Sequence, residues 1–227
     1  MKASELYSGL VTKVRGYNGA LATTNEFVSP QSIAWGEGST NKNLSLGAGA
    51  TLTVASSSAN DKAASAGASK IKVIGAEAVT GKVIEEEITL NGQTSVTSVA
   101  LFQAVYHAYV SALGTGGSSN AGIIGIAIGT CTNTSGVLTA PTPALTIPVG
   151  EGMATGAMFI VPSGEKRVCK DLIIGASTQP VVVTIWIRSA TEGLWMNYGT
   201  IPVGNVGLNR VDLSGLPELE AGDVIRV

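Results

Sequence analysis

The chain has 227 residues, of which only 13% are charged, and its formal net charge of −2 gives it no basic field for a nucleic acid. Gly, Ser, Thr and Asn interrupt its apolar runs well before the ~20 residues that a membrane-spanning helix needs. The 29 glycines, together with plentiful Val, Ile and Thr, favour strands and tight turns over helices. We therefore expect an all-β protein that binds neither nucleic acid nor a membrane.

The N-terminal residues differ in character from the rest of the chain. Residues 1–50 show no sustained periodicity, and Gly36–Asn41 has the composition of a loop. We expect an extended N-terminal arm that anchors the protein in an assembly. Its apolar side chains Phe27, Ile33 and Trp35 are candidate assembly contacts, because a free coil has little use for them.

Strand patterns begin near residue 52. In the first half they predict strands over Leu52–Ala55, Lys70–Ile74, Val83–Leu90, Val105–Val110 and Ile123–Ile128. Polar side chains in Ser56–Asp61 offer caps for one or two helical turns that continue to Ala66. Asn91-Gly92, directly after a predicted strand, is a strong signal for a two-residue hairpin turn.

The second half has cleaner alternation. A turn at Pro162–Glu165 predicts a hairpin between Ala157–Val161 and Arg167–Ile174. Further strands are predicted over Val181–Arg188, Trp195–Thr200, Leu208–Leu213 and Asp223–Val227. About ten short strands without βαβ alternation indicate one antiparallel β-sandwich or jelly roll over residues 51–227.

The middle of the chain is unusually poor in charge. The 63 residues from Ile88 to Gly150 contain no Asp, Glu, Lys or Arg, where average usage would place roughly fifteen. We interpret this charge-free segment as one that lies largely against sister copies or neighbouring proteins. Strand edges without charged residues also invite pairing with other chains.

Catalytic signals are weak. His107 is the only histidine, it lies in an alternating strand pattern, and no G-x-S-x-G motif accompanies it. The segment Gly114–Ser119 lacks the Lys-Ser/Thr pair of a phosphate loop. Cys131 and Cys169 match no metal or redox spacing, so we expect reduced thiols, no metal, no cofactor and no enzymatic activity.

Glu85, Glu86 and Glu87 alternate across a predicted strand. We expect Glu85 and Glu87 to face solvent beside Lys70 or Lys72. Glu86 falls on the apolar face, where a local ion pair or exposure at the strand end is the simplest interpretation. A contact between subunits is the alternative for Glu86.

Three aromatic residues in the second half suggest another possibility. Trp186, Trp195 and Tyr198 lie on or beside predicted strands. Burial in a core or interface is the usual role of such rings. The alternative is that they stack on a sugar, as in a carbohydrate- or receptor-binding module.

Several segments resemble β-rich structural virion proteins of tailed bacteriophages. These are Leu52–Ala64, Ala68–Gly75, Glu86–Gly92 and Met158–Glu165, and the likeness covers roughly residues 50–227. The resemblance implies a non-enzymatic, jelly-roll-like, oligomeric component of the head surface, neck, fibre or spike. It supplies no catalytic residue.

Together these features predict a virion structural protein. We expect it to form a homo-oligomer, as a trimer, and to attach to major capsid, portal or neck proteins. Because residues 1–5 lack the apolar run of a secretory signal, we expect synthesis in the host cytoplasm before incorporation into the virion.

Overall fold

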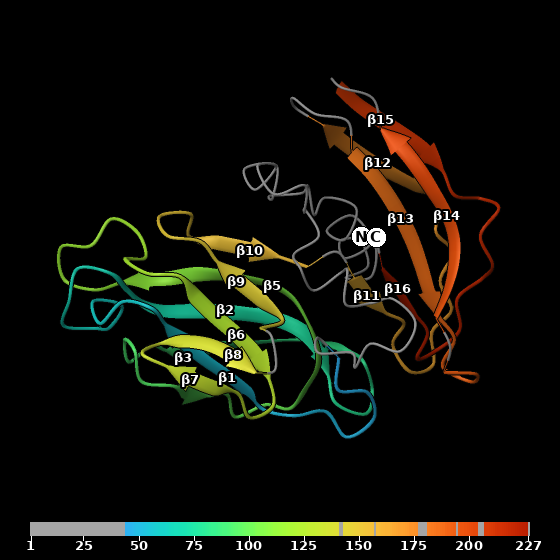
Figure 1. Ribbon diagram of the computed structural model, residues 1–227. Coiled ribbons are helices and arrows are strands. Elements are labelled where there is room, and N and C mark those ends of the chain that lie inside the picture. The colour runs from blue at the N-terminus through green and yellow to red at the C-terminus, as the bar shows by residue number, and fades with distance from the viewer. Residues whose placement is uncertain are drawn as a thin grey trace. The chain divides into compact units, whose positions relative to one another are not determined.

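The computed structural model describes residues 44–140, 143–156, 158–176, 181–193, 195–203 and 207–226. These residues form strands, turns and loops without a helix, which confirms the all-β prediction. They fall into two compact units, one within residues 38–156 and one within residues 157–227. Each unit is described by itself (Figure 1).

The first unit is a β-sandwich-like pair of antiparallel four-stranded sheets. Sheet A has the strand order β10-β5-β2-β3 and sheet B the order β4-β1-β6-β9. In sheet A the bounds are β2 Ala68–Glu77, β3 Val83–Thr89, β5 Phe102–Leu113 and β10 Met153–Thr155. In sheet B they are β1 Leu52–Ser56, β4 Val96–Thr97, β6 Ile124–Ile128 and β9 Leu145–Ile147.

The core of this unit lies between the two sheets. Alternating side chains of β6 all point into it, since Ile124, Ile126 and Ile128 are buried as their spacing predicts. From sheet A the core receives Ile71, Val73, Phe102 and Val105 among others. Burial of each such side chain stabilises the fold by about 1.5–3 kcal/mol before conformational entropy is counted.

A short hairpin adds a third layer outside sheet B. It consists of β7, Thr132–Thr134, and β8, Val137–Ala140. Leu138 packs over Ala55 and Ala127, and a Cβ at Gly125 would stand 3.3 Å from the Leu138 side chain. Glycine at 125 therefore makes room for the covering leucine.

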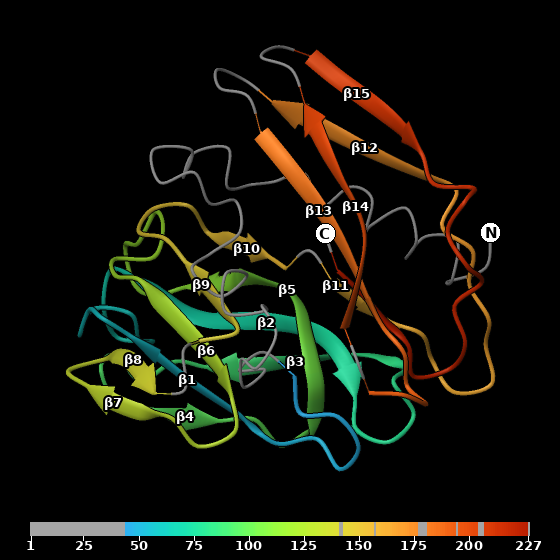
Figure 2. The ribbon, with the colours of Figure 1, turned by 45° about the vertical axis from the view of Figure 1, so that its right-hand side comes forward.

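The second unit contains a four-stranded sheet and a two-stranded ribbon, seen from a second angle in Figure 2. The sheet order is β11-β16-β13-β14, with bounds β11 Met158–Ile160, β13 Val181–Arg188, β14 Trp195–Val203 and β16 Val224–Arg226. The ribbon pairs β12, Asp171–Ala176, with β15, Gly207–Asp212. Its core contains Ile185, Ile187 and Leu219, separate from that of the first unit.

Strand positions match the sequence patterns better than strand partners do. The predicted hairpin around Pro162–Glu165 is wrong, because β11 pairs with β16 and β12 pairs with β15. The turn at Asn91-Gly92 forms, but it connects β3 of sheet A to β4 of sheet B and closes no hairpin. In both places the strands pair with strands distant in the sequence and not with the next strand along the chain.

The predicted helical turns between Ser56 and Ala66 are also wrong. This segment is a loop, and the polar groups expected to cap a helix bind elsewhere. Asp61 accepts hydrogen bonds from the amides of Ala68, Ala121 and Gly122 instead. The side-chain acceptor that would have capped a helix thus binds amides elsewhere in the fold.

The predicted domain organisation consisted of an N-terminal arm and one β-domain. The arm, with Phe27, Ile33 and Trp35, lies outside the described residues apart from its last few positions. The segment 51–227, predicted as a single domain, contains a boundary between compact units at Gly156. The jelly-roll order of strands stays a prediction.

Candidate interaction surfaces

The outer face of sheet A carries paired charges. Lys70 Nζ lies 2.7 Å from Glu87 Oε1, and Lys72 Nζ lies 3.1 Å from Glu85 Oε1. This confirms the prediction that Glu85 and Glu87 face solvent beside these lysines. Hydrogen bonds from Lys70 and then Ser111 lower the pKa of Glu87. All four charged side chains are exposed or partly exposed, so these pairs contribute little to stability.

Glu86 points to the opposite, inner face of the same strand. One carboxylate oxygen accepts the amide of Val99 at 2.7 Å and the other accepts the amide of Ala100 at 2.9 Å. β3 is an edge strand of sheet A, and residues 98–101 follow β4, an edge strand of sheet B. Glu86 therefore ties the two sheets together at their edges, using hydrogen bonds within the chain.

His107 lies on β5, as predicted, and its Nδ1 is 2.9 Å from Thr155 Oγ1 on β10. Its ring centroid is 5.5 Å from that of Tyr109. Burial lowers the pKa of His107, and a hydrogen bond with the Ala154 backbone partly opposes that shift. The imidazole is therefore neutral at neutral pH.

The surroundings of His107 form an open depression with Tyr109, Val110, Glu151, Gly152 and Met153. A hydrolytic site needs a hydroxyl beside the imidazole, a third group that orients the imidazole, and donors for an oxyanion. Thr155 supplies the first of these. The ring interacts with Thr155, Tyr109 and the Ala154 backbone, which hold its orientation on the sheet.

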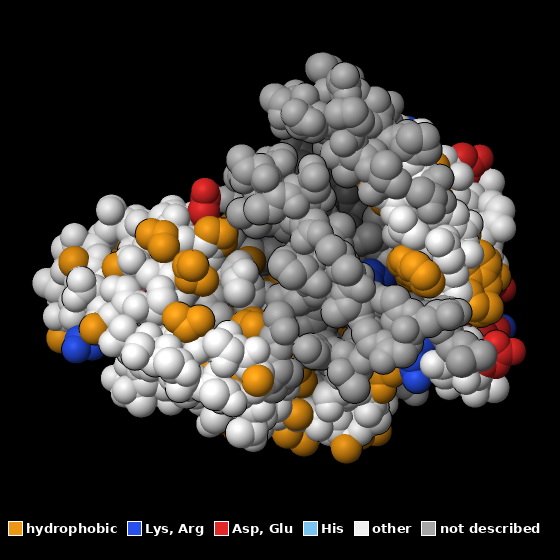
Figure 3. Space-filling view, in the orientation of Figure 1, with side chains coloured by type: hydrophobic (Ala, Val, Ile, Leu, Met, Phe, Trp, Pro, Cys, Tyr) orange, Lys and Arg blue, Asp and Glu red, His pale blue; other side chains and the backbone are white. Residues whose placement is uncertain are grey.

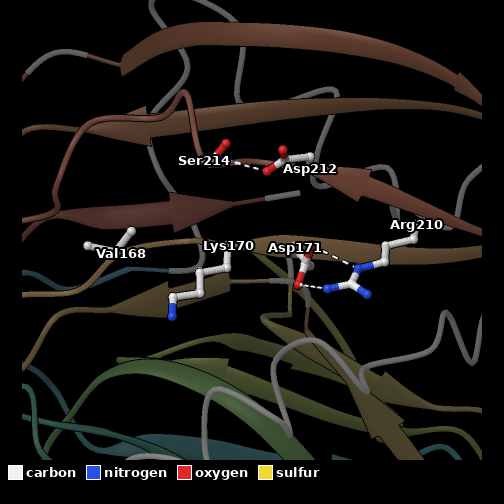
Figure 4. Close-up of a pocket in the computed structure, with 6 residues that line it drawn as sticks. All are labelled: Val168, Lys170, Asp171, Arg210, Asp212 and Ser214. Atoms are coloured by element: carbon white, nitrogen blue, oxygen red, sulfur yellow. Dashed lines mark hydrogen bonds and ion pairs between the residues drawn. The ribbon is translucent and has the colours of Figure 1, made fainter.

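A second depression lies on the β12–β15 ribbon and is lined by charged groups (Figure 4). Arg210 donates from Nε to one oxygen of Asp171 at 2.9 Å and from a terminal nitrogen to the other at 2.6 Å. Lys170 points away from this pair, and Asp212 accepts the amide of Ser214 at 2.8 Å. The Arg210 hydrogen bond lowers the pKa of Asp171, and the Ser214 backbone lowers that of Asp212.

We next consider whether the described residues could bind a metal ion or use a cysteine as a nucleophile. Within the described ranges, no three His, Cys, Asp or Glu side chains are placed to hold a metal ion. Neither Cys131 nor Cys169 is in a disulfide, and burial raises the pKa of each thiol. Neither is poised as a nucleophile, since the reactive form is the thiolate.

The predicted aromatic group falls within one pair of strands. Trp186 of β13 stands opposite Asn197 of β14, and Trp195 stands opposite Arg188. The ladder shifts register between Ile185 and Trp186, next to Tyr198. Trp186 is half-buried and Tyr198 is 38% exposed.

The charge-free segment contributes both core and surface. Its buried part supplies β5, β6 and β9, while Figure 3 shows hydrophobic side chains scattered over a face of the first unit that has few charged groups. Six large hydrophobic side chains of this segment are exposed, namely Val99, Leu101, Leu113, Ile123, Val137 and Val149. Where exposed apolar side chains form a contiguous patch, that patch is typical of a region that contacts other macromolecules.

Sequence reasoning missed two buried polar residues that organise the loops between strands. Asp61 is fully buried, and its carboxylate accepts the hydroxyl of Ser56 in addition to three amides. Asn120 donates to the carbonyls of Gly122 and Pro148. Both lie in loops rich in Gly, Ser and Asn, where composition alone does not distinguish a buried polar anchor from a solvated one.

Comparisons with known proteins add no relative: no family model matches the chain, and neither the curated proteins nor the solved structures contain a significant match. Among the described residues, no helix occurs that would be long and apolar enough to cross a membrane.

Proposed function

We propose that this chain is a non-enzymatic structural subunit of a tailed-bacteriophage virion, which associates with itself and with other particle proteins. The observation that carries the proposal is the surface of the charge-free segment. It exposes six large hydrophobic side chains, and no residue in its 63 positions carries a formal charge. Repulsion between like charges keeps soluble proteins apart, and the free energy falls when another surface covers apolar surface.

The virion setting is the more specific part of the proposal. It is supported by the likeness of Leu52–Ala64, Glu86–Gly92 and Met158–Glu165 to β-rich phage structural proteins. An all-β unit with a charge-poor exterior suits head decoration, a neck protein, or the base of a fibre or spike. The partners would then be the major capsid, portal or neck proteins.

Light scattering of the purified full chain tests self-association. We expect a homo-oligomer, with a trimer at three times the chain mass of 22.9 kDa. A monomer at every accessible concentration would count against self-association.

Mass spectrometry of gradient-purified particles tests the virion role. The chain is expected at fixed stoichiometry, and a variant lacking residues 1–45 is expected to remain a folded oligomer outside the particle. Incorporation of that truncated chain would contradict the anchoring role of the N-terminal arm.

The carbohydrate-binding alternative has one observation in its favour. Trp186, Trp195 and Tyr198 all fall within the β13–β14 pair. Titration with a panel of sugars while tryptophan fluorescence is recorded tests it directly, because stacking on a ring changes its emission. An unchanged spectrum across the panel would remove this alternative.

A further inference from the structure

The exposed hydrophobic side chains of the first unit gather at its two opposite ends. β5 runs the length of the unit, from Phe102 at one end to Leu113 at the other, and β2 runs antiparallel beside it. We call the end near Phe102 the valine end and the end near Leu113 the glycine end. Figure 2 shows the loops of these two ends on either side of the sheets.

The valine end is made by three loops that bind one another. Ala78 donates its amide to the carbonyl of Leu101 at 2.9 Å, and Val79 donates to the carbonyl of Gly47 at 3.0 Å. Four aliphatic side chains project there, namely Val79, Val83, Val99 and Leu101. Val99 is 90% exposed and Val79 is 77% exposed, so the described residues leave both side chains largely uncovered.

The backbone at Val79 is strained. Its φ is +71°, and Thr80 donates to the carbonyl of Ala78 at 2.8 Å, which closes a γ-turn of the rare form with positive φ. A β-branched residue seldom occupies this region. Such outliers persist where the surroundings enforce them, and they concentrate at functional positions.

The carboxylates of the valine end already accept hydrogen bonds within it, and the exposed Lys82 lies between Val79 and Val83 in the chain. Glu77 accepts the hydroxyl of Thr80, and Glu86 accepts the amides of Val99 and Ala100. Binding at this end would therefore bury aliphatic carbon while both carboxylates keep these hydrogen bonds. The end is a preformed apolar contact surface.

The glycine end presents a second apolar surface of the same kind. Its exposed aliphatic side chains are Leu113, Ile123, Val137 and Val149. Leu113 ends β5 and Val137 begins β8, whereas Ile123 and Val149 adjoin loops fixed by Asp61 and Asn120. Asp61 binds the amides of Ala121 and Gly122, and Asn120 binds Pro148 and Gly152. All four lie within the charge-free segment.

We propose that the valine end of one copy binds the glycine end of the next, so that copies of this chain associate head to tail through their first units. A second copy is the occupant because one molecule carries two separate aliphatic patches at opposite ends of one strand pair. A single foreign partner would need only one patch. Contacts between different patches produce a closed ring or an open filament, and a trimer is the smallest ring.

This inference rests on the proposed self-association and specifies its geometry. Full-length Val99→Asp and Ile123→Asp variants are compared by sedimentation velocity with wild type and with Val168→Asp, a control at an exposed valine of the other unit. Burial of an uncompensated carboxylate is expected to weaken assembly by more than about tenfold in either end variant. The control is expected to assemble as wild type does.

Mixing the two end variants separates head-to-tail from symmetric contacts. The Val99→Asp copy keeps an intact glycine end and the Ile123→Asp copy keeps an intact valine end, so the mixture is expected to form heterodimers and stop there. Circular dichroism checks the fold, and Val99→Ser and Val149→Asp repeat the test should either first variant misfold.

Three results would overturn the inference. Wild-type assembly that both end variants retain would place the contact elsewhere, while self-association itself would stand. Loss of assembly in only one end variant, or a mixture that stays monomeric, would indicate a symmetric contact. A monomeric wild type would overturn both this inference and the proposed self-association.

Discussion

Asp61 shows how a single side chain holds several loops of the first unit. Its carboxylate is fully buried and accepts four hydrogen bonds, from the hydroxyl of Ser56 and the amides of Ala68, Ala121 and Gly122. A buried donor left without an acceptor costs about 1–3 kcal/mol. Asp61 therefore stabilises loops that are separated by about sixty positions in the chain.

Replacement of Asp61 by Ala is expected to lower the free energy of unfolding of the first unit by about 3 kcal/mol, because several buried donors lose their acceptor at once. Urea unfolding followed by far-ultraviolet circular dichroism measures this. Asp171→Ala is the control, since that carboxylate pairs with Arg210 in the second unit, and little change in the stability of the first unit is expected. Equal effects in both variants would contradict the anchoring role of Asp61.

His107 offers a pH-dependent observable that no other residue shares. Burial lowers its pKa below the ordinary value of 6.5. The unfolded chain therefore binds more protons than the folded one between these two pKa values, so stability rises with pH across that window. Stability is expected to fall as the pH drops below 6.5, and to level off below the pKa of the folded state.

Nuclear magnetic resonance can follow the imidazole without assignment, because the chain has one histidine. Its midpoint in the folded protein is expected below 6.5. A His107→Gln variant is expected to lose the corresponding part of the pH dependence of unfolding. A midpoint above 6.5 would mean that a neighbouring anion dominates over burial.

At the scale of elements, the two sheets of the first unit are tied at an edge by Glu86. Its oxygens accept the amides of Val99 and Ala100, next to the exposed valine end. Glu86→Ala is expected to cost about 1–3 kcal/mol in the free energy of unfolding, since both amides lose a charged acceptor. Glu85→Ala, one residue away and in an exposed pair with Lys72, is expected to leave it nearly unchanged.

The same variants also probe the contact surface. Loss of Glu86 frees the loop that carries Val99, so the valine end would lose its preformed shape. Assembly is therefore expected to weaken in Glu86→Ala and to persist in Glu85→Ala, as sedimentation velocity would show. Equal assembly in both would mean that the loop holds its shape without Glu86.

Alternation along the chain located most of the longer strands and their buried faces. Ile124, Ile126 and Ile128 share a buried face, and the charges of Glu85 and Glu87 lie where the period of two puts them. The partner of each strand was not predictable in this way. Whether β11 pairs with β12 or with β16 depends on the packing of distant segments, and a local turn signal carries no information about that.

The candidate surfaces show the same division between local and distant information. The absence of charge from residues 88–150 was visible in the sequence and indicated an unusual surface. The gathering of Val79 with Val99 and Leu101 was not, because residues some twenty positions apart meet only once β2 and β5 pair. Likewise, the strained turn at Val79 has no sequence signature, because a positive φ is expected at glycine and not at a β-branched valine.

For the whole molecule, the presence of two separate hydrophobic cores predicts that the two units unfold independently. Every strand of sheets A and B, and every residue of their shared core, lies within residues 38–156. Strands of the second unit pair only with one another among the described residues. A fragment of residues 38–156 is therefore expected to fold alone, with dispersed amide resonances and one cooperative unfolding transition.

Urea unfolding of the full chain gives the midpoint with which the fragment is compared. Trp186 and Trp195 belong to the second unit, so tryptophan fluorescence reports largely on that unit, whereas circular dichroism reports on both. We expect the isolated fragment to keep the urea midpoint that the first unit has in the full chain. A fragment that stays unfolded, or that unfolds at much lower urea, would mean that the first unit depends on residues outside 38–156 for its stability, and the head-to-tail contact would then have to be sought in both units together.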